Sequence, residues 1–416
     1  MLLRFLVAAA SVFFSFSAHA WELTKLDLPP MKWADIYHIA DDGSALTGMF
    51  FPAARSFYWS RETGVVLDAS DVMTPDGKTL LQIEGANNQP ARLVALDPRT
   101  GEKKSWPLPY TKDSLSLPSV SPFFFSRGAV LRHTIFNDNS EDGISSEHCL
   151  VWTPQRGVTE IRKEGIRRLF CAGISGNGTA VVGSYLNTEE NSSGSFYWSE
   201  SRGFVPFESR FDLPEISGNG LVVTAWPRLV KLGKPELGYE PATFWSPDTG
   251  FTPLGKDGFG QTIPLHISHD GQVIAGMLLT EREITAPWGK VAVRHAFRWT
   301  PGTGVVDLGV LGTENDVSSG PLKISADGSV ILGSQRGQDE SSSGYWIWTA
   351  NQGLRNLKDA LKAAGIDLAH LEPWWVNDMS ADAGTFVLEK ETDRTLYILH
   401  VGDLFRTGGR TENGKR

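Results

Sequence analysis

Five ionisable side chains occupy the same position in a recurring pattern, four residues before the Asp or Asn of an expected tight turn. They are His38, Glu215, His266, Lys323 and Asp378. Histidines, carboxylates and an amine that share a cleft could act as general acids and bases, because a protein environment moves their pKa values apart. The same mixture could form a self-neutralising, hydrated lining of a central channel, and we favour this second interpretation.

Aromatic and basic side chains gather in five segments of variable length, 108–121, 136–148, 226–241, 277–294 and 356–375. From these segments we predict the ligand-binding residues Tyr110, Trp226, Arg228, Tyr239, Arg282, Trp288, Trp374 and Trp375. Aromatic faces with polar groups beside them suit sugar rings or peptide partners. The alternative is that each aromatic side chain only anchors its own long loop.

Metal and catalytic motifs are weak or missing. The acidic loop 138–143 has oxygen ligands at alternate positions, as a Ca²⁺ loop would, but Cys149 stands where the twelfth-position carboxylate is needed. His266 and His269 have no identifiable third ligand. The sequence lacks the nucleophile-elbow, zincin, dinucleotide-binding and P-loop motifs. We therefore predict no metal and no cofactor, and we favour a non-enzymatic role while leaving catalysis open.

The elements that must position these residues form an internal repeat. Six copies share an apolar stretch that ends in Trp, with a Gly five positions later: Trp59, Trp152, Trp198, Trp245, Trp299 and Trp348. Two degenerate copies keep this spacing at Leu96 and Tyr397. The anchors recur roughly every 40 to 55 residues, the length of one propeller blade. We expect the Trp side chains to fill the space between neighbouring repeats, because each can bury a large apolar area.

Each repeat is predicted to form four antiparallel strands. An Asp-Gly or Asn-Gly dipeptide, as at Asp270-Gly271 and Asp327-Gly328, marks a tight turn between the first two strands. About eight such units, with seven as the alternative, predict an all-β propeller. Residues 22–26 are expected to supply the last fourth strand and close the ring, with 403–405 as the competing donor.

The predicted strand order also selects a face. Loops between strands one and two, and between three and four, lie at one end of an antiparallel unit and are short here. Loops between strands two and three, and the links to the next unit, lie at the other end and are long and variable. Ligand sites are often built on variable loops that a rigid scaffold holds. We therefore predict that this long-loop face binds the ligand.

The repeat resembles the HAF family of predicted extracellular repeats. The name-giving tripeptide stands at His295-Ala296-Phe297, followed by Arg298-Trp299-Thr300, and the run 324–333 is similar to the family pattern. The resemblance covers most of the chain from 41 to 388. It implies an exported, propeller-like protein and implies no activity.

The ends of the chain predict export. Residues 1–20 are typical of a signal peptide, with Arg4 before an apolar run and cleavage expected between Ala20 and Trp21. We then expect one propeller domain, 21–405, and a disordered tail, 406–416. Cys149 and Cys171 are the only cysteines and form either one disulfide or two inert thiols. The net charge of −9 disfavours general binding to nucleic acid or anionic lipid.

These observations predict an exported, periplasmic or extracellular β-propeller that binds a glycan or protein ligand through its long-loop face. We expect a monomer with no nucleic-acid partner and no stable membrane insertion. One alternative is a glycoside hydrolase or lyase on the same scaffold. Another is a periplasmic scaffold in envelope assembly.

Overall fold

The computed structural model describes residues 21–29, 32–70, 72–85, 90–111, 115–116, 129–136, 144–166, 168–187, 192–208, 211–227, 243–255, 262–286, 289–312, 318–337 and 343–406. The predicted signal peptide, the tail beyond Arg406 and the acidic loop 138–143 lie outside these residues.

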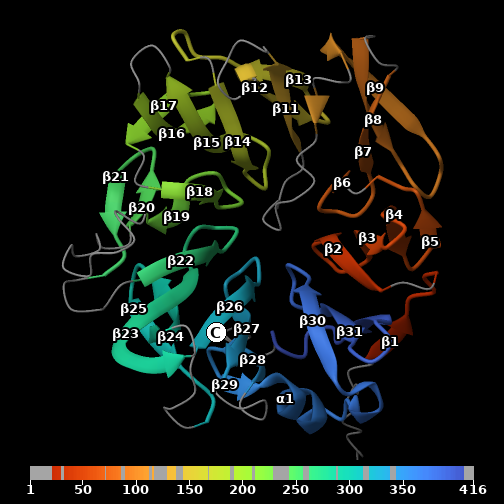
Figure 1. The fold of residues 1–416 in the computed structure, drawn as a ribbon, viewed down its shortest axis with the longest axis vertical. Helices are drawn as coiled ribbons and strands as arrows, with labels where there is room; N and C mark the ends of the chain where they lie inside the picture. The colour runs from red at the N-terminus through yellow and green to blue at the C-terminus, as the bar shows by residue number, and fades with distance from the viewer. Residues whose placement is uncertain are drawn as a thin grey trace, which may run out of the picture.

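The described strands fall into units of four that follow one another around a ring (Figure 1). Unit 1 holds β2 (Trp33–Ile39), β3 (Ala45–Phe51), β4 (Arg55–Ser60) and β5 (Gly64–Leu67). Unit 2 holds β6 (Val72–Met73), β7 (Leu80–Glu84), β8 (Pro90–Leu96) and β9 (Lys103–Thr111). Unit 3 holds β10 (Leu115–Ser116), β11 (Ala129–Phe136), β12 (Ile144–Thr153) and β13 (Gly157–Ile161). Unit 4 holds β14 (Arg168–Ile174), β15 (Ala180–Asn187), β16 (Ser192–Ser199) and β17 (Gly203–Glu208).

The second half of the chain repeats this arrangement. Unit 5 holds β18 (Phe211–Ile216), β19 (Val223–Pro227), β20 (Thr243–Ser246) and β21 (Gly250–Pro253). Unit 6 holds β22 (Thr262–Ile267), β23 (Ile274–Ala286), β24 (Gly289–Thr300) and β25 (Gly304–Gly309). Unit 7 holds β26 (Ser318–Ile324), β27 (Val330–Arg336), β28 (Gly344–Thr349) and β29 (Gly353–Asn356). Unit 8 holds β30 (Trp374–Met379), β31 (Thr385–Lys390), β32 (Leu396–His400) and β1 (Glu22–Lys25).

The N-terminal strand β1 is the fourth strand of unit 8. It pairs antiparallel with β32, with Glu22 opposite His400 and Lys25 opposite Tyr397. In Figure 1 the red β1 lies beside the blue strands of that unit. Residues 403–405, the competing donor, form a turn instead.

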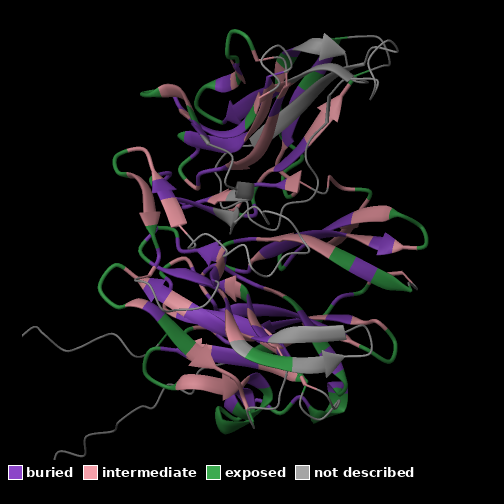
Figure 2. Ribbon diagram, turned by 60° about the vertical axis from the view of Figure 1, so that its left-hand side comes forward, coloured by how far each residue is buried: buried purple, intermediate pink, exposed green. Residues whose placement is uncertain are grey.

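Apolar clusters join each unit to the next. The cluster between units 5 and 6 contains Trp299 and Phe297, and the cluster between units 2 and 3 contains Trp152. The last unit packs on the first in the same way, with Ile398 against Trp59 and Phe57. Buried residues accordingly lie within the strands, and exposed ones concentrate at the turns (Figure 2). The repeated Trp residues thus have the packing role that the sequence predicts.

Hydrogen bonds of the serine side chain and a glycine with positive φ stabilise the Ser-x-Asp-Gly and Ser-x-Asn-Gly turns. In unit 7 the Ser325 hydroxyl donates to Asp327 over 2.7 Å and accepts the backbone N–H of Val330 over 3.0 Å. Gly328 follows with a φ of 67°, which glycine adopts without strain. Successive turns also bond one another through their backbones, as from Ala326 N–H to the Ala381 carbonyl at 2.7 Å. The turn of unit 8 reaches that of unit 1, from Asp382 N–H to the Asp41 carbonyl at 2.9 Å.

Two segments expected to contribute to the long-loop face contain regular structure. Residues 277–294 lie largely in the β23–β24 hairpin. Residues 356–375 include helix α1 (Leu357–Ala363), capped at its N-terminus by Asn356, and a 3₁₀ turn, Ala369–Leu371. The helix buries Leu357 and Leu361 in the cluster between units 7 and 8.

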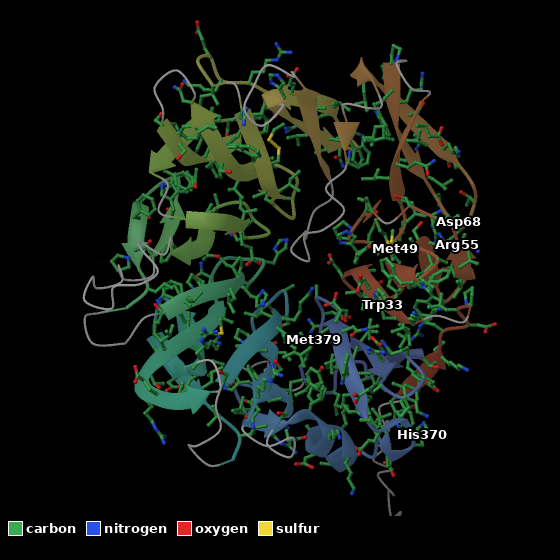
Figure 3. All side chains as sticks on the ribbon, in the orientation of Figure 1. Trp33, Met49, Arg55, Asp68, His370 and Met379 are labelled. Atoms are coloured by element: carbon green, nitrogen blue, oxygen red, sulfur yellow. A yellow bond between two sulfur atoms is a disulfide. The ribbon has the colours of Figure 1, made fainter. Side chains whose placement is uncertain are left out.

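Cys149 and Cys171 form a disulfide that joins β12 of unit 3 to β14 of unit 4 (Figure 3). It therefore links two consecutive units. No helix in the described part of the chain has the length and apolarity needed to cross a membrane.

Candidate functional site

The five ionisable residues singled out by the turn spacing lie on the innermost strands of five consecutive units (Figure 1). Glu215 is on β18, His266 on β22, Lys323 on β26, Asp378 on β30 and His38 on β2. We call this set the inner polar cluster.

A β-bulge precedes every member of the inner polar cluster. The pairing register shifts between Ile36 and His38, and again between Pro321 and Lys323. It also shifts just before Glu215, His266 and Asp378. A bulge bends its strand and re-aims the side chain that follows it. The repeated bulge therefore gives these five side chains one common placement relative to their strands.

Lys323 is the electrostatic centre of the cluster. Its Nζ lies 2.9 Å from Oδ1 of Asp378, and these side chains are only 13% and 11% exposed. The Lys323 charge also acts on His38, Glu215 and His266. One ammonium group thus interacts with all four other members, drawn from four other units.

Burial keeps both histidines neutral. It lowers the pKa of His266 to about 3, aided by the Lys323 charge and opposed by a hydrogen bond to the Pro321 carbonyl. Burial, again aided by Lys323, lowers the pKa of His38 to about 4, and Asp378 opposes this shift. His38 Nε2 is buried and has no hydrogen-bond partner within the described part of the chain.

Glu215 is held toward its protonated form. Burial raises its pKa well above the ordinary value, although the Lys323 charge and the backbone N–H of Ile267 both lower it. Its side chain is partly accessible, and the surrounding protein desolvates it. Desolvation by the surrounding protein is therefore the main cause of the raised pKa of Glu215. Within the cluster, Lys323 and Asp378 compensate each other's charge.

The predicted ligand-binding residues have different outcomes. Trp375 is 40% exposed, and Arg282 is exposed on β23. Trp374 is only 4% exposed and stacks on Tyr345 with ring centroids 6.3 Å apart. It is a packing residue rather than an exposed ligand contact, because adjacent residues of a strand point to opposite faces.

The side chains of the other five predicted ligand-binding residues lie outside the described part of the structure. Tyr110 and Trp226 lie on β9 and β19, and their side chains are outside the description. Arg228, Tyr239 and Trp288 fall outside the described residues altogether.

Exposed apolar side chains mark one part of the ring, where the sequence predicted Trp375 but not Trp33 or Leu322. Trp33 on β2, Leu322 on β26 and Trp375 on β30 are 42%, 40% and 40% exposed. They lie on the inner strands of units 7, 8 and 1, which are neighbours. Figure 3 marks Trp33 at the start of β2 and Met379 at the end of β30. The sequence places these exposed side chains close to the inner polar cluster, because Leu322 stands one residue before Lys323 and Trp375 three residues before Asp378.

Solved structures of several known proteins are similar to this chain at low sequence identity. No protein-family model matches the chain, and no curated protein matches it. Dipeptidyl peptidase 4 of Porphyromonas gingivalis is similar, with a TM-score of 0.49, 9% identity, and coverage of 88% of this chain and 58% of that one. An oligogalacturonate lyase in complex with manganese has a TM-score of 0.48, 12% identity, and coverage of 92% and 94%. The β-propeller domain of the Trilobed protease from Pyrococcus furiosus has a TM-score of 0.43, 11% identity, and coverage of 88% and 95%.

This chain spans little more than half the length of the peptidase. Its own strand pairing defines the class: the chain is an all-β protein of the propeller type.

Proposed function

We propose that this chain is an exported β-propeller binding protein that recognises a glycan or protein ligand on the face where its inner strands begin. The observation that carries the proposal is the exposure of Trp33 and Trp375 at the beginning of two neighbouring inner strands, with Leu322 exposed farther along a third. Large exposed apolar side chains that gather in one region favour an interaction site over a solvated surface.

The opposite face offers less for recognition. There the inner strands end in short, uniform turns whose backbones bond one another, as His269 does to Ala326. The face where the strands begin carries the variable connections, including the long β23–β24 hairpin and the segment that holds α1. Variable segments on a rigid frame are the usual place for ligand contacts.

The inner polar cluster supports a polar ligand. Burying ionisable groups is costly, and such groups often mark functional sites. Lys323 and Asp378 directly follow the exposed Leu322 and the Asn377 bulge on their strands. An approaching ligand would thus meet apolar side chains first and hydrogen-bonding groups beyond them.

A carbohydrate-active enzyme is the second candidate. Glu215 is held toward the protonated acid, whereas Asp378 is paired with Lys323. Two carboxyl groups in different environments can supply a general acid and a base or nucleophile. A scaffold role in envelope assembly remains the third candidate. Export itself rests on the pattern of residues 1–20 and the HAF resemblance.

Glycan-array screening and affinity capture from envelope extracts test the proposal with the purified protein. Hits are then titrated calorimetrically against wild type, the Trp33→Ala/Trp375→Ala double variant and Leu221→Ala. Leu221 is 47% exposed on a turn of the opposite face and serves as the matched control. We expect only the double variant to weaken binding. Binding that survives it would place the site elsewhere, and conversion of a bound glycan to product would establish the enzyme instead.

A further inference from the structure

Trp375 belongs to a side-chain network at the face where the inner strands begin. The Arg394 guanidinium carbon lies 4.7 Å from the centroid of the Trp375 ring. Arg394 Nη1 donates to Glu389 Oε1 over 2.8 Å, and Asn377 Nδ2 donates to Glu389 Oε2 over 3.0 Å. Glu389 stands opposite Trp375 in the β30–β31 ladder. Both carboxylate oxygens of Glu389 thus accept hydrogen bonds, and Glu389 holds the Arg394 guanidinium near the Trp375 ring.

The construction of this network is costly for the fold. Glu389 is only 4% exposed, so its charge is largely removed from water. Arg394 has a φ of 60°, a left-handed conformation that is uncommon for a residue with a side chain. Strained backbone of this kind persists where the surroundings over-determine it and is often found at ligand sites. The result is an exposed indole and a guanidinium held in one arrangement before any ligand arrives.

The charge of the network limits the ligand. Arg394 is compensated by Glu389, and the nearby Lys323 is compensated by Asp378. A strongly anionic ligand would therefore meet no uncompensated cation among these four residues. The guanidinium retains N–H donors beyond the one given to Glu389, because it carries five. The exposed part of the indole offers an apolar face beside them.

We propose that Trp375 and Arg394 form a stacking platform for an uncharged saccharide ring. This inference rests on the proposed binding function and names the ligand class of the same face. The C–H face of the sugar packs on the indole, and its hydroxyl groups accept hydrogen bonds from Arg394. Glu389 is a positioning residue that acts by holding the Arg394 guanidinium over the Trp375 ring.

Calorimetric titration of the purified protein with neutral oligosaccharides, and with uronate and sulfated counterparts, tests this proposal. Trp375→Ala should raise the Kd for the neutral sugar at least about tenfold, because it removes the aromatic contact. Arg394→Lys keeps a cation for Glu389 but loses the guanidinium and its N–H donors beside the ring, and should raise the Kd by about threefold to tenfold. Leu221→Ala is the matched control, since Leu221 is 47% exposed but lies on a turn of the opposite face.

Two further readouts test the positioning role of Glu389 and the lack of charge on the ligand. Glu389→Gln should raise the Kd for the neutral sugar by about as much as Arg394→Lys does. This increase should appear even if the melting temperature of Glu389→Gln equals that of wild type. The Kd for the neutral sugar should also change little between low and high salt, because no net charge is paired.

Tighter binding of uronate or sulfated sugars, with steep salt dependence, would overturn the ligand class and leave the binding function standing. Capture of a protein partner with no saccharide binding would do the same. Saccharide binding that Trp375→Ala leaves unchanged would overturn the platform alone. Absence of any ligand on this face would overturn both the platform and the proposed function.

Discussion

The two buried histidines should make the stability of the protein fall steeply with acidification. Burial lowers the pKa of His38 to about 4 and of His266 to about 3, from an ordinary value of 6.5. The unfolded chain therefore binds more protons than the folded one below pH 6.5. The contribution of the two histidines to stability must then be highest above that pH and must be lost as the pH falls toward the folded-state pKa values.

The size of the effect follows from the two shifts. Each pH unit below the unfolded pKa costs the folded state about 1.4 kcal/mol per histidine until the folded pKa is reached. Between pH 7 and pH 5 each histidine should therefore remove about 2 kcal/mol, and the pair about 4 kcal/mol. Glu215 acts in the opposite sense, because a raised pKa favours the folded state as the pH falls. Single histidine variants isolate the histidine contribution from that of Glu215.

The assay is urea unfolding of wild type, His38→Gln and His266→Gln at pH 7 and pH 5. Each variant should lose about 2 kcal/mol less than wild type between the two pH values, whatever its stability at pH 7. His269→Gln, which changes an exposed histidine in the same unit, is the matched control and should follow wild type. Equal losses in wild type and His266→Gln would refute the burial of a neutral imidazole at this position.

Other changes test the remaining parts of the structure. Lys323→Met should lower the free energy of unfolding by about 3 kcal/mol by leaving Asp378 buried without its cation, as measured by chemical denaturation; stability equal to wild type would exclude the ion pair. Ser325→Ala should cost about 1 to 3 kcal/mol, because Ser325 is only 1% exposed and its hydroxyl bonds Asp327 and the Val330 N–H, whereas Ser329→Ala, at a half-buried position, should cost less. Cys149→Ala/Cys171→Ala should cost about 3 kcal/mol, since the cysteines are 22 residues apart, and a melting temperature insensitive to reductant would argue against the bond.

Local spacing was sufficient to predict the repeated unit. The Trp-to-Gly interval marks the third strand and the turn after it, because both features lie within a few residues. The same regularity located His38, Glu215, His266, Lys323 and Asp378, since each stands at a fixed distance from its turn. The sequence did not show the bulge before each of them, or that Lys323 would be their centre.

Features that depend on register or on distant contacts could not be predicted. The choice between Trp374 and Trp375 depends on which face of β30 meets unit 7. The β23–β24 hairpin extends through Glu281 and Glu283, where the charged sequence gives no buried strand pattern. The Glu389–Arg394–Trp375 network needs the β30–β31 register, which brings Glu389 opposite Trp375.

A crystal structure of the protein with the ligand found by screening tests the central claim most directly. We expect the ligand to lie at the beginning of β26, β30 and β2, in contact with Trp375 and within reach of the inner polar cluster. A ligand bound at the short turns around Leu221, or along the outer strands, would contradict it.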